Sequence, residues 1–335
     1  MSGSFSMANE IVIISNLVTW IFAALVLDFI FGDPKWLPHP VRLIGRAAMA
    51  LEAPMRKRFT NPKTAGNVTA AVIILGTALV TAGLLWGAQK IHPLADDVLS
   101  VILLYTTFAA RGLASHSYAV YKALKAGDLP LARQQVAKMV GRDTEQLDEK
   151  GIVRAAVESV AENSVDGVVA PLFFAFLFGP VGAMTYKAIS TLDSTFGYKN
   201  EKYIDFGWAS AKIDDLANYI PARLSLLLIP LASLFTDSSP FGAWRMCWRD
   251  SRKHASPNSG FPESAFAGAL GVQLGGPLMR HGQPTSTPLI GEPLQPLEQK
   301  HIIKANVLLI SFTLIATIVF DAVYFLVDIC VYQLF

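Results

Sequence analysis

The chain has 335 residues, of which 52% are hydrophobic and 16% are charged, and its mean hydropathy is +0.40. An ordinary soluble domain carries roughly 25% charged residues, so this composition indicates an integral membrane protein. The formal net charge is +2, and the basic residues are dispersed without interleaved aromatic side chains, so we expect no nucleic-acid partner. Cys247 and Cys330 lie far apart in different contexts, which is typical of packing residues and not of a disulfide framework.

Six apolar stretches are candidates for membrane spans. Three are long enough to cross a hydrocarbon core, which takes ~20 residues. They cover residues 11–31, 68–88 and 305–327. Three others are shorter or interrupted, and they cover residues 95–114, 168–189 and 216–236. Gly179-Pro180 interrupts one and Pro221 and Pro230 interrupt another, so each is either a kinked span or a re-entrant hairpin. We predict an all-α polytopic membrane protein with four to six transmembrane or re-entrant helices and cytosolic helical segments, forming one domain over 1–335.

The distribution of Lys and Arg predicts the orientation. The first ten residues contain neither, whereas residues 32–67 contain seven, so we expect the N-terminus outside and an uncleaved first span. Residues 111–164 carry eight and 237–304 carry seven, which predicts that both stretches lie in the cytosol. Segment 190–215 lies outside if its flanks cross fully, and inside if they are re-entrant.

Two short regions around the first and last spans are rich in proline. Gly32-Asp33-Pro34 and Pro38-His39-Pro40 force a turn where the chain leaves the bilayer.

Asp28 lies inside the apolar run, where acids are costly and usually functional. Arg42 and Arg46 lie one helical turn apart, a spacing that suits a phosphate. Structural and functional roles explain that region equally well. The Pro-rich stretch 277–304 predicts a mobile cytosolic loop before the last span.

Acidic residues recur every four positions ahead of the interrupted stretch at 168–189. Glu158, Glu162 and Asp166 lie near one side of a helix if the helix persists that far. An intrahelical ion pair of Arg154 with Glu158 explains one acid but not three. The run from Asn163 to Gly167 also predicts a helix end, with Asp166 capping the next helix. Even so, Glu162, Asn163 and Asp166 form an oxygen-rich group that suits Mg²⁺.

Residues 187–223 form another polar region, which alternates charged and aromatic side chains. Its acids are Asp193, Glu201, Asp205, Asp214 and Asp215, its bases are Lys187, Lys199, Lys202, Lys212 and Arg223, and its aromatic residues include Tyr198, Tyr203, Phe206 and Trp208. A solvated charged loop is the usual explanation of such a run. Beside a membrane cavity, the same alternation suits a metal ion and a polyphosphate together.

Residues 254–276 form the last such region, which combines polar and small residues. Ala267, Gly271 and Gly275 recur every four positions, which predicts a small-residue face for helix packing. Asn258 and Glu263 precede that face and are candidates for substrate contact. The sequence contains neither G-x-x-x-x-G-K-[ST] nor G-x-G-x-x-G, so it does not favour a standard nucleotide-binding fold.

These regions closely resemble the CobD/CbiB family of cobalamin biosynthesis, the adenosylcobinamide-phosphate synthases. The similar strings are GDPKWLPHPVRLIGR, VGRDTEQL, VAENSVDGVVAPLFFAF, YKAISTLDSTFGYKNEKY, GWASAKIDDLANYIPARLS and SPNSGFPESAFAGALGVQLGGP. They follow the family's order as far as about residue 277, after which this chain has Leu278-Met279 where many members have Asn and an aromatic residue.

The resemblance implies an enzyme of the prokaryotic inner membrane that joins adenosylcobyric acid to (R)-1-amino-2-propanol phosphate, with ATP, to give adenosylcobinamide phosphate. The expected partners are these substrates, the lipid bilayer and other corrinoid-pathway enzymes. Ethanolamine phosphate and threonine phosphate stay open as amines, and so does the oligomeric state. A membrane transporter and a scaffold that recruits corrinoid enzymes are the alternative functions.

The chemistry assigns roles to the clustered residues. ATP must activate the carboxylate as an acyl phosphate, and an ammonium with a pKa of about 10 must lose a proton before it attacks. We expect Mg²⁺ to be held by Glu162, Asn163, Asp166, Asp214 and Asp215, with Asp166 and Asp214 also catalytic. Arg42, Arg46, Lys187 and Lys212 would contact phosphates, and Asp193 or His39 would accept the amine's proton. Trp208 and Tyr198 would stack on the corrin ring or adenine, and Asn258 and Glu263 would contact substrate.

Overall fold

The structure is a computed structural model that describes residues 3–34, 36, 39–280 and 282–334. The chain divides into two compact units. Unit 1 comprises Met1–Ala109, Ala170–Ala217 and Phe320–Phe335, and unit 2 comprises Ala110–Val169 and Asn218–Val319. That the two form the single domain expected from the sequence stays a prediction.

Unit 1 is helical throughout its main elements, which are α1 (Gly3–Phe31), α2 (Pro40–Arg58), α3 (Pro62–Ile91), α4 (Pro93–Tyr105), α8 (Ala170–Phe196) and α9 (Trp208–Ala217). Three of them begin at a proline, whose missing N–H is unneeded in a first turn. The Asn61 side chain caps α3 by accepting the N–H groups of Lys63 and Thr64. Non-helical backbone at Phe178 and Gly179, just before Pro180, kinks α8 as the sequence indicates.

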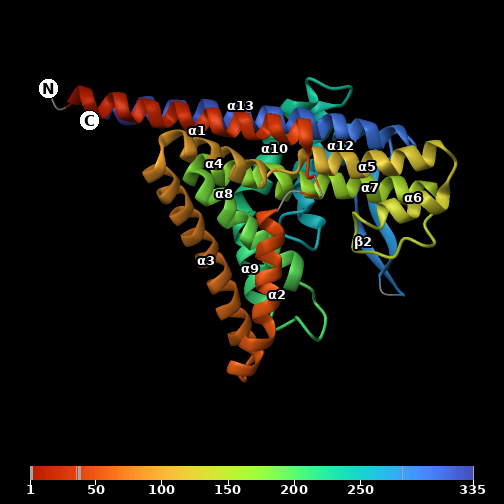
Figure 1. Cartoon of the computed structure of the whole chain (residues 1–335). Helices are drawn as coiled ribbons and strands as arrows, with labels where there is room; N and C mark the ends of the chain where they lie inside the picture. Colours follow the sequence, from red (N-terminus) through yellow and green to blue (C-terminus); the bar gives the residue numbers. More distant parts are fainter. Residues whose placement is uncertain (1–2, 35, 37–38, 281, 335) are drawn as a thin grey trace. The chain divides into compact units, whose positions relative to one another are not determined.

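The core of unit 1 lies between α2, α3, α8 and α9, which lie side by side (Figure 1). Its buried members include Ile44, Ala48, Ala65, Ala70, Ile73, Met184, Ala188, Leu192, Phe196 and Phe206. At Gly66 of α3, an added Cβ would lie 1.8 Å from the carbonyl oxygen of Phe206. The absence of a side chain at Gly66 therefore lets α3 touch the backbone that precedes α9.

Unit 2 contains α5 (Ala110–Lys125), α6 (Leu129–Val136), α7 (Glu149–Ser164), the π-helix η1 (Val165–Val169), α10 (Tyr219–Ser233), α11 (Pro240–Asp250), the 3₁₀-helix η2 (Ser251–Lys253), α12 (Gly260–Leu270), β1 (Gln273–Arg280), β2 (Gln283–Gly291) and α13 (Lys300–Leu334, in this unit as far as Val319). The short helix α12 lies at its centre, because nearly all of its residues are buried and it packs against α7, α10 and α11.

Small residues bring α11 and α12 together, but not those that the spacing predicts. A Cβ added at Gly268 would lie 2.1 Å from the carbonyl oxygen of Gly242, so the two backbones touch. Gly271 ends α12 with φ +63°, and Gly275 lies in β1 with φ +79°. The predicted helical face of Ala267, Gly271 and Gly275 is therefore wrong, since the last two adopt the left-handed backbone that glycine favours.

A β-hairpin replaces much of the loop expected over 277–304. β1 and β2 pair antiparallel from Gln273↔Gly291 to Arg280↔Gln283, with an irregularity between Leu274 and Gly276. Each strand of a two-stranded sheet has one unpaired edge, so prolines fit where no ladder N–H is needed. The loop interpretation is therefore wrong for 277–280 and 283–291, while mobility of this segment stays a prediction.

Five helical stretches are long and apolar enough to cross a membrane, judged by length and composition among the described residues. They are Pro62–Ile91, Pro93–Lys125, Glu149–Phe196, Trp208–Ser233 and Lys300–Val327. Five of the predicted stretches fall within or overlap them, and the sixth coincides with the end of α1, where Asn16–Phe31 is a shorter apolar helix. The prediction of an all-α polytopic membrane protein is confirmed, with the hairpin as an addition.

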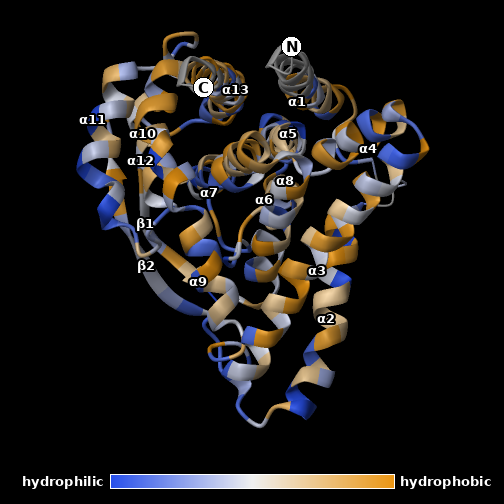
Figure 2. Cartoon of the chain, turned by 90° about the vertical axis from the view of Figure 1, so that its left-hand side faces the viewer, coloured by the Kyte–Doolittle hydropathy of each residue, from blue (hydrophilic) through white to orange (hydrophobic). Residues whose placement is uncertain are grey.

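α3 illustrates why these helices suit lipid. Only 22% of its apolar window is buried, and its exposed side chains include Leu75, Leu79, Val80, Leu84 and Trp86. Apolar residues colour much of the helix orange in Figure 2. A helix that is apolar around its whole circumference matches a hydrocarbon environment and not water.

Candidate functional site

The acidic face of α7 in unit 2 begins at Glu158, which is 5% exposed. Arg142 Nη2 donates to its Oε2 at 2.5 Å, and the Gly275 N–H donates to its Oε1 at 2.7 Å. Arg154 instead donates to the carbonyl oxygens of Gly275 and Pro277, at 2.6 and 2.9 Å. The predicted Arg154–Glu158 ion pair is therefore wrong, because both side chains turn to other partners. Together they fasten the hairpin to α7.

One turn further along α7, Glu162 has an exposed carboxylate. Its Oε1 accepts a hydrogen bond from Ser259 Oγ at 3.0 Å. Ser256 Oγ accepts the backbone N–H groups of Asn258 and Ser259, which shapes the loop ahead of α12. The arrangement therefore brings Glu162 against the segment predicted to contact substrate, a proximity that spacing in the sequence could not establish.

Glu263 lies inside this site, at 6% exposure, in the first turn of α12. Burial raises its pKa well above the usual range, and the charges of Glu162 and Glu158 raise it further, against a lowering by Arg142. His254 Nε2 is 3.7 Å from Glu263 Oε1. Its Nδ1 accepts the Ser256 N–H, which assigns the ring proton to Nε2, facing Glu263. Burial and the neighbouring carboxylates therefore favour protonation of Glu263 more than exposure to solvent would.

The helix does not end at Asn163. The Asn163 Nδ2 donates to the Ser159 carbonyl oxygen at 2.8 Å, and the chain continues through the π-helix Val165–Val169 directly into α8. The predicted helix end, with Asp166 as a cap, is wrong. A π-turn inserts an extra residue into the helix and often marks a functional position. Asp166 is half-buried in that turn, so its register differs from the four-residue spacing that the sequence predicts.

Asn258, the other predicted contact residue of this loop, is buried. Its Oδ1 accepts a hydrogen bond from Arg223 Nη1 at 3.2 Å. Arg223 Cζ also lies 3.3 Å from the centre of the Tyr219 ring and 4.7 Å from that of Phe261. Asn258 therefore positions an arginine at the start of α10, which sequence reasoning placed only within a charged run.

In unit 1, the predicted phosphate contacts lie on α2, α8 and, for Lys212, α9. Arg42 and Arg46 are exposed one turn apart on α2. Between them, the Cβ position of Gly45 lies 3.5 Å from Thr191 Cγ2 of α8. Thr191 follows Lys187 by one turn and donates to its carbonyl oxygen at 2.6 Å. The structure therefore packs the α2 turn that carries both arginines against the α8 turn that follows the lysine.

The two predicted bases lie elsewhere in unit 1. His39 Nε2 is 3.1 Å from Asp33 Oδ1, immediately before α2. Asp193 lies in the last turn of α8, where a Cβ at Gly197 would lie 2.0 Å from its Oδ1. Gly197 thus leaves space for the Asp193 carboxylate. That Asp193 or His39 accepts the amine's proton stays a prediction.

The predicted stacking residues Tyr198 and Trp208 are both exposed, at 57% and 44%. Tyr198 lies 6.5 Å from Tyr203, ring centre to ring centre. Lys63 Nζ lies 3.7 Å from the centre of a Trp208 ring, so one face of the indole carries a cation from α3. Sequence reasoning missed Lys63, because cation–π pairing between distant helices leaves no local signal.

The predicted metal ligands fall in both units, with Glu162, Asn163 and Asp166 in unit 2 and Asp214 and Asp215 in unit 1. On α9, Lys212 Nζ lies 3.2 Å from Asp215 Oδ2. Within each unit, no group of three or more His, Cys, Asp or Glu side chains among the described residues is arranged to hold a metal ion. Mg²⁺ needs only one or two carboxylates beside water and phosphate, and the exposed carboxylate of Glu162 fits that requirement. The ligand set stays a prediction.

Comparisons with known proteins identify the family. A family model described as "CobD/Cbib protein" matches residues 21–309. The cobalamin biosynthesis protein CobD of Geobacter metallireducens is 51% identical over 282 residues, which cover 83% of this chain and 87% of that protein. CobD of Leptospira interrogans is 43% identical over 301 residues, covering 90% and 96%. CbiB of Salmonella typhi is 45% identical over 283 residues, covering 83% and 88%.

No solved structure matches the chain at a significant level. The family model and each of these three relatives span most of the sequence, and the family model includes the buried α7 and α12 residues of unit 2. The chain therefore belongs to the CobD/CbiB family of cobalamin biosynthesis proteins.

Proposed function

We propose that this protein catalyses the ATP-dependent ligation of adenosylcobyric acid with (R)-1-amino-2-propanol phosphate, giving adenosylcobinamide phosphate, ADP and inorganic phosphate. Its family membership and the arrangement of charged residues around α7 and α12 support the proposal. A role in cobalamin biosynthesis follows from the family, and the reaction itself is the step proposed here.

The reaction has two stages. The corrinoid carboxylate attacks the γ-phosphorus of ATP, which forms an acyl phosphate and releases ADP. The amine, once deprotonated, attacks the acyl carbon, forms the amide and releases phosphate with the C–O electron pair. The first stage requires cationic groups around phosphate, and the second requires a base near the amine.

In unit 2, Ser259 donates a hydrogen bond to the Glu162 carboxylate, and Asn163 and Asp166 follow along the same continuous helical stretch. These three residues would hold Mg²⁺, which neutralises phosphate charge when bound. The observation that carries this assignment is the 3.0 Å contact of Glu162 with Ser259, because it anchors an exposed carboxylate to the loop that precedes α12.

In unit 1, Arg42 and Arg46 present two guanidinium groups one turn apart on a helix packed against α8. Guanidinium groups bind phosphate in a bidentate manner, so this pair and Lys187 would orient a polyphosphate. Asp214 and Asp215 would contribute metal contacts there, and Asp193 or His39 would take the amine's proton.

The test uses the full chain in detergent or nanodiscs, with ATP, adenosylcobyric acid and aminopropanol phosphate. We expect corrinoid-dependent release of ADP and a product of the mass of adenosylcobinamide phosphate. Asp166→Ala and Asp214→Ala should each lower the turnover by at least about 100-fold, as loss of a catalytic charge does. Asp237→Ala is the matched control, since the Asp237 side chain is 91% exposed and its ion-pair partner Lys304 is not among the predicted site residues.

Two other results would replace the proposal. Corrinoid uptake into proteoliposomes without ligated product would indicate a transporter, a function to which the kink of α8 at Gly179 lends some support. Product that forms only when other corrinoid enzymes are added, and at the same rate with Asp166→Ala, would indicate a scaffold.

A further inference from the structure

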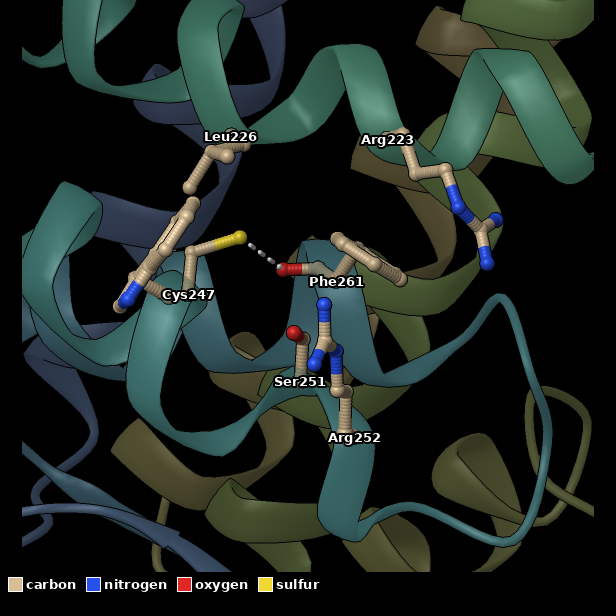
Figure 3. Close-up of a pocket in the computed structure, with 7 residues that line it drawn as sticks. Arg223, Leu226, Cys247, Ser251, Arg252 and Phe261 are labelled. Atoms are coloured by element: carbon tan, nitrogen blue, oxygen red, sulfur yellow. Dashed lines mark hydrogen bonds between the residues drawn. The ribbon is translucent and has the colours of Figure 1, made fainter.

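Two adjoining pockets in unit 2 form one groove, which we call the α10–α12 groove. Their volumes are about 230 and 420 Å³, and both are lined by Arg223, Ser251, Arg252 and Phe261. Figure 3 shows the first pocket, with Arg223 on α10, Arg252 on η2 and Phe261 on α12. The second pocket continues past Tyr219, His254, Ser256 and Pro257.

Arg252 brings an uncompensated charge to this groove. Two nearby basic residues both bind Asp250. Arg249 donates to both of its carboxylate oxygens at 2.7 Å, and Lys253 Nζ lies 2.7 Å from its Oδ1. Burial raises the pKa of Asp250, but these donors and the Gly291 N–H outweigh it and lower the pKa to about 2. Arg252 itself is exposed and forms no hydrogen bond or ion pair with another residue in the described part of the chain.

Arg223 brings a second guanidinium in a fixed orientation. Its Nη1 donates to the Tyr219 carbonyl oxygen at 2.7 Å and to Asn258 Oδ1 at 3.2 Å, and its plane lies near the rings of Tyr219 and Phe261. None of these contacts neutralises the charge. A guanidinium that is already immobilised loses little entropy when it binds a phosphate, and several of its N–H groups remain to do so.

The rest of the groove discriminates among anions. Hydroxyl groups of Ser251 and Ser256 line it, and neither pocket is lined by a carboxylate among the described residues. ATP binds with Mg²⁺, which needs oxygen ligands such as carboxylates, so the groove suits a phosphate that arrives without a metal. Two arginines match the double charge of a phosphate monoester better than the single charge of a lipid phosphodiester.

We propose that the α10–α12 groove binds the phosphate group of the amino-alcohol phosphate substrate, with Arg252 and Arg223 as its cationic contacts. The choice of this substrate rests on the proposed function, whereas the capacity to bind a phosphate monoester does not. Arg252 was absent from the residues expected from the sequence, because it lies among basic neighbours that have structural partners.

The experiment measures binding to the purified full chain in detergent by calorimetry. The probes are aminopropanol phosphate, inorganic phosphate, unphosphorylated 1-amino-2-propanol and Mg·ATP, with phosphatidylglycerol nanodiscs as the lipid probe. In Arg252→Gln, we expect the Kd of both phosphate probes to rise about 10-fold, as loss of one charge-assisted contact predicts. The Kd values of unphosphorylated amine and Mg·ATP should be unchanged. Arg252→Lys should restore part of the affinity, and Arg280→Gln, at an exposed β1 arginine outside the groove, should change nothing.

Three outcomes overturn the proposal: unchanged phosphate affinity in Arg252→Gln, weakened affinity for Mg·ATP alone, or an effect that appears only as altered binding to phosphatidylglycerol nanodiscs. The proposed function fails separately. If Arg252 governs phosphate binding but the chain forms no ligated product, the groove stands and the reaction does not. If product forms and Arg252→Gln leaves the KM for aminopropanol phosphate unchanged, the reaction stands and the groove does not.

Discussion

Arg142 and Glu158 form an ion pair of 2.5 Å between the loop after α6 and the middle of α7, with side chains that are 15% and 6% exposed. The same carboxylate accepts the Gly275 N–H of the hairpin. Three segments that are distant in the sequence therefore meet at one buried charge. Because Glu158 lies one turn before Glu162, this pair also holds the helix that presents the predicted metal ligands.

Removing the cation tests this structural role. Arg142→Met should lower the free energy of unfolding by on the order of 3 kcal/mol, because it leaves a buried carboxylate without its counter-ion. The measurement is an SDS titration of the purified protein. The double variant Arg142→Met/Glu158→Gln should recover part of the loss, since a neutral amide costs less to bury than an unpaired charge. A double variant no more stable than Arg142→Met would contradict this account.

The α11–α12 contact predicts a sharp difference between two glycines. Gly268→Ala should destabilise the protein by about 3 kcal/mol or prevent its folding, because the new methyl group would lie 2.1 Å from the Gly242 carbonyl oxygen. Gly76→Ala on α3 is the control, since an added Cβ there has no neighbour within 4 Å. It should change stability by no more than about 0.5 kcal/mol. Equal effects of the two substitutions in thermal unfolding would show that the helices separate readily.

The sequence predicted what local patterns encode. Hydropathy windows located the apolar helices, because each window is a property of consecutive residues. The interruption at Gly179-Pro180 likewise predicted either a kinked span or a re-entrant hairpin, and the backbone of α8 is kinked there. Spacing failed where backbone conformation decides: Gly271 fits a helical repeat of small residues, yet its left-handed φ ends the helix.

Long-range pairing explains what the sequence could not predict about the site. Helical spacing predicted an ion pair of Arg154 with Glu158, but Arg154 binds the hairpin and Glu158 binds Arg142. Neither choice is visible without knowing that residues 273–291 form a hairpin. The sequence likewise did not predict that Glu162 lies next to the segment around Asn258, and the Ser259 contact supplies that geometry.

Glu263 gives the protein a pH-dependent stability of known sign. Its pKa is raised in the folded state by burial and by Glu162 and Glu158, against Arg142, with His254 also facing it. Between its unfolded pKa of about 4.5 and the higher folded value, the folded state binds more protons, so stability falls as pH rises through that window. Glu263→Gln cannot ionise. Its apparent Tm relative to that of the unsubstituted protein should therefore increase as the pH is raised from about 4.5.

The control for that comparison is Glu145→Gln, because Glu145 is an exposed acid outside the α7–α12 cluster. Its unfolding curves should run parallel to those of the unsubstituted protein at every pH. A Glu263→Gln advantage that stays constant or shrinks across the same pH range would show that Glu263 is ionised without cost in the folded protein.

Labelling from one side of the membrane distinguishes the two orientations of segment 190–215. Lys199 is exposed between α8 and α9, so Lys199→Cys in a Cys330→Ser background offers one accessible thiol. Burial raises the pKa of the Cys247 thiol to about 12, which leaves almost no thiolate to react at neutral pH and allows that cysteine to remain. If the catalytic groups of unit 1 use cytosolic ATP, an impermeant maleimide should label the introduced thiol in inverted vesicles and not in spheroplasts. Labelling confined to spheroplasts would place Lys199 outside, on the side that lacks ATP, and would remove its neighbours Asp193 and Tyr198 from the reaction.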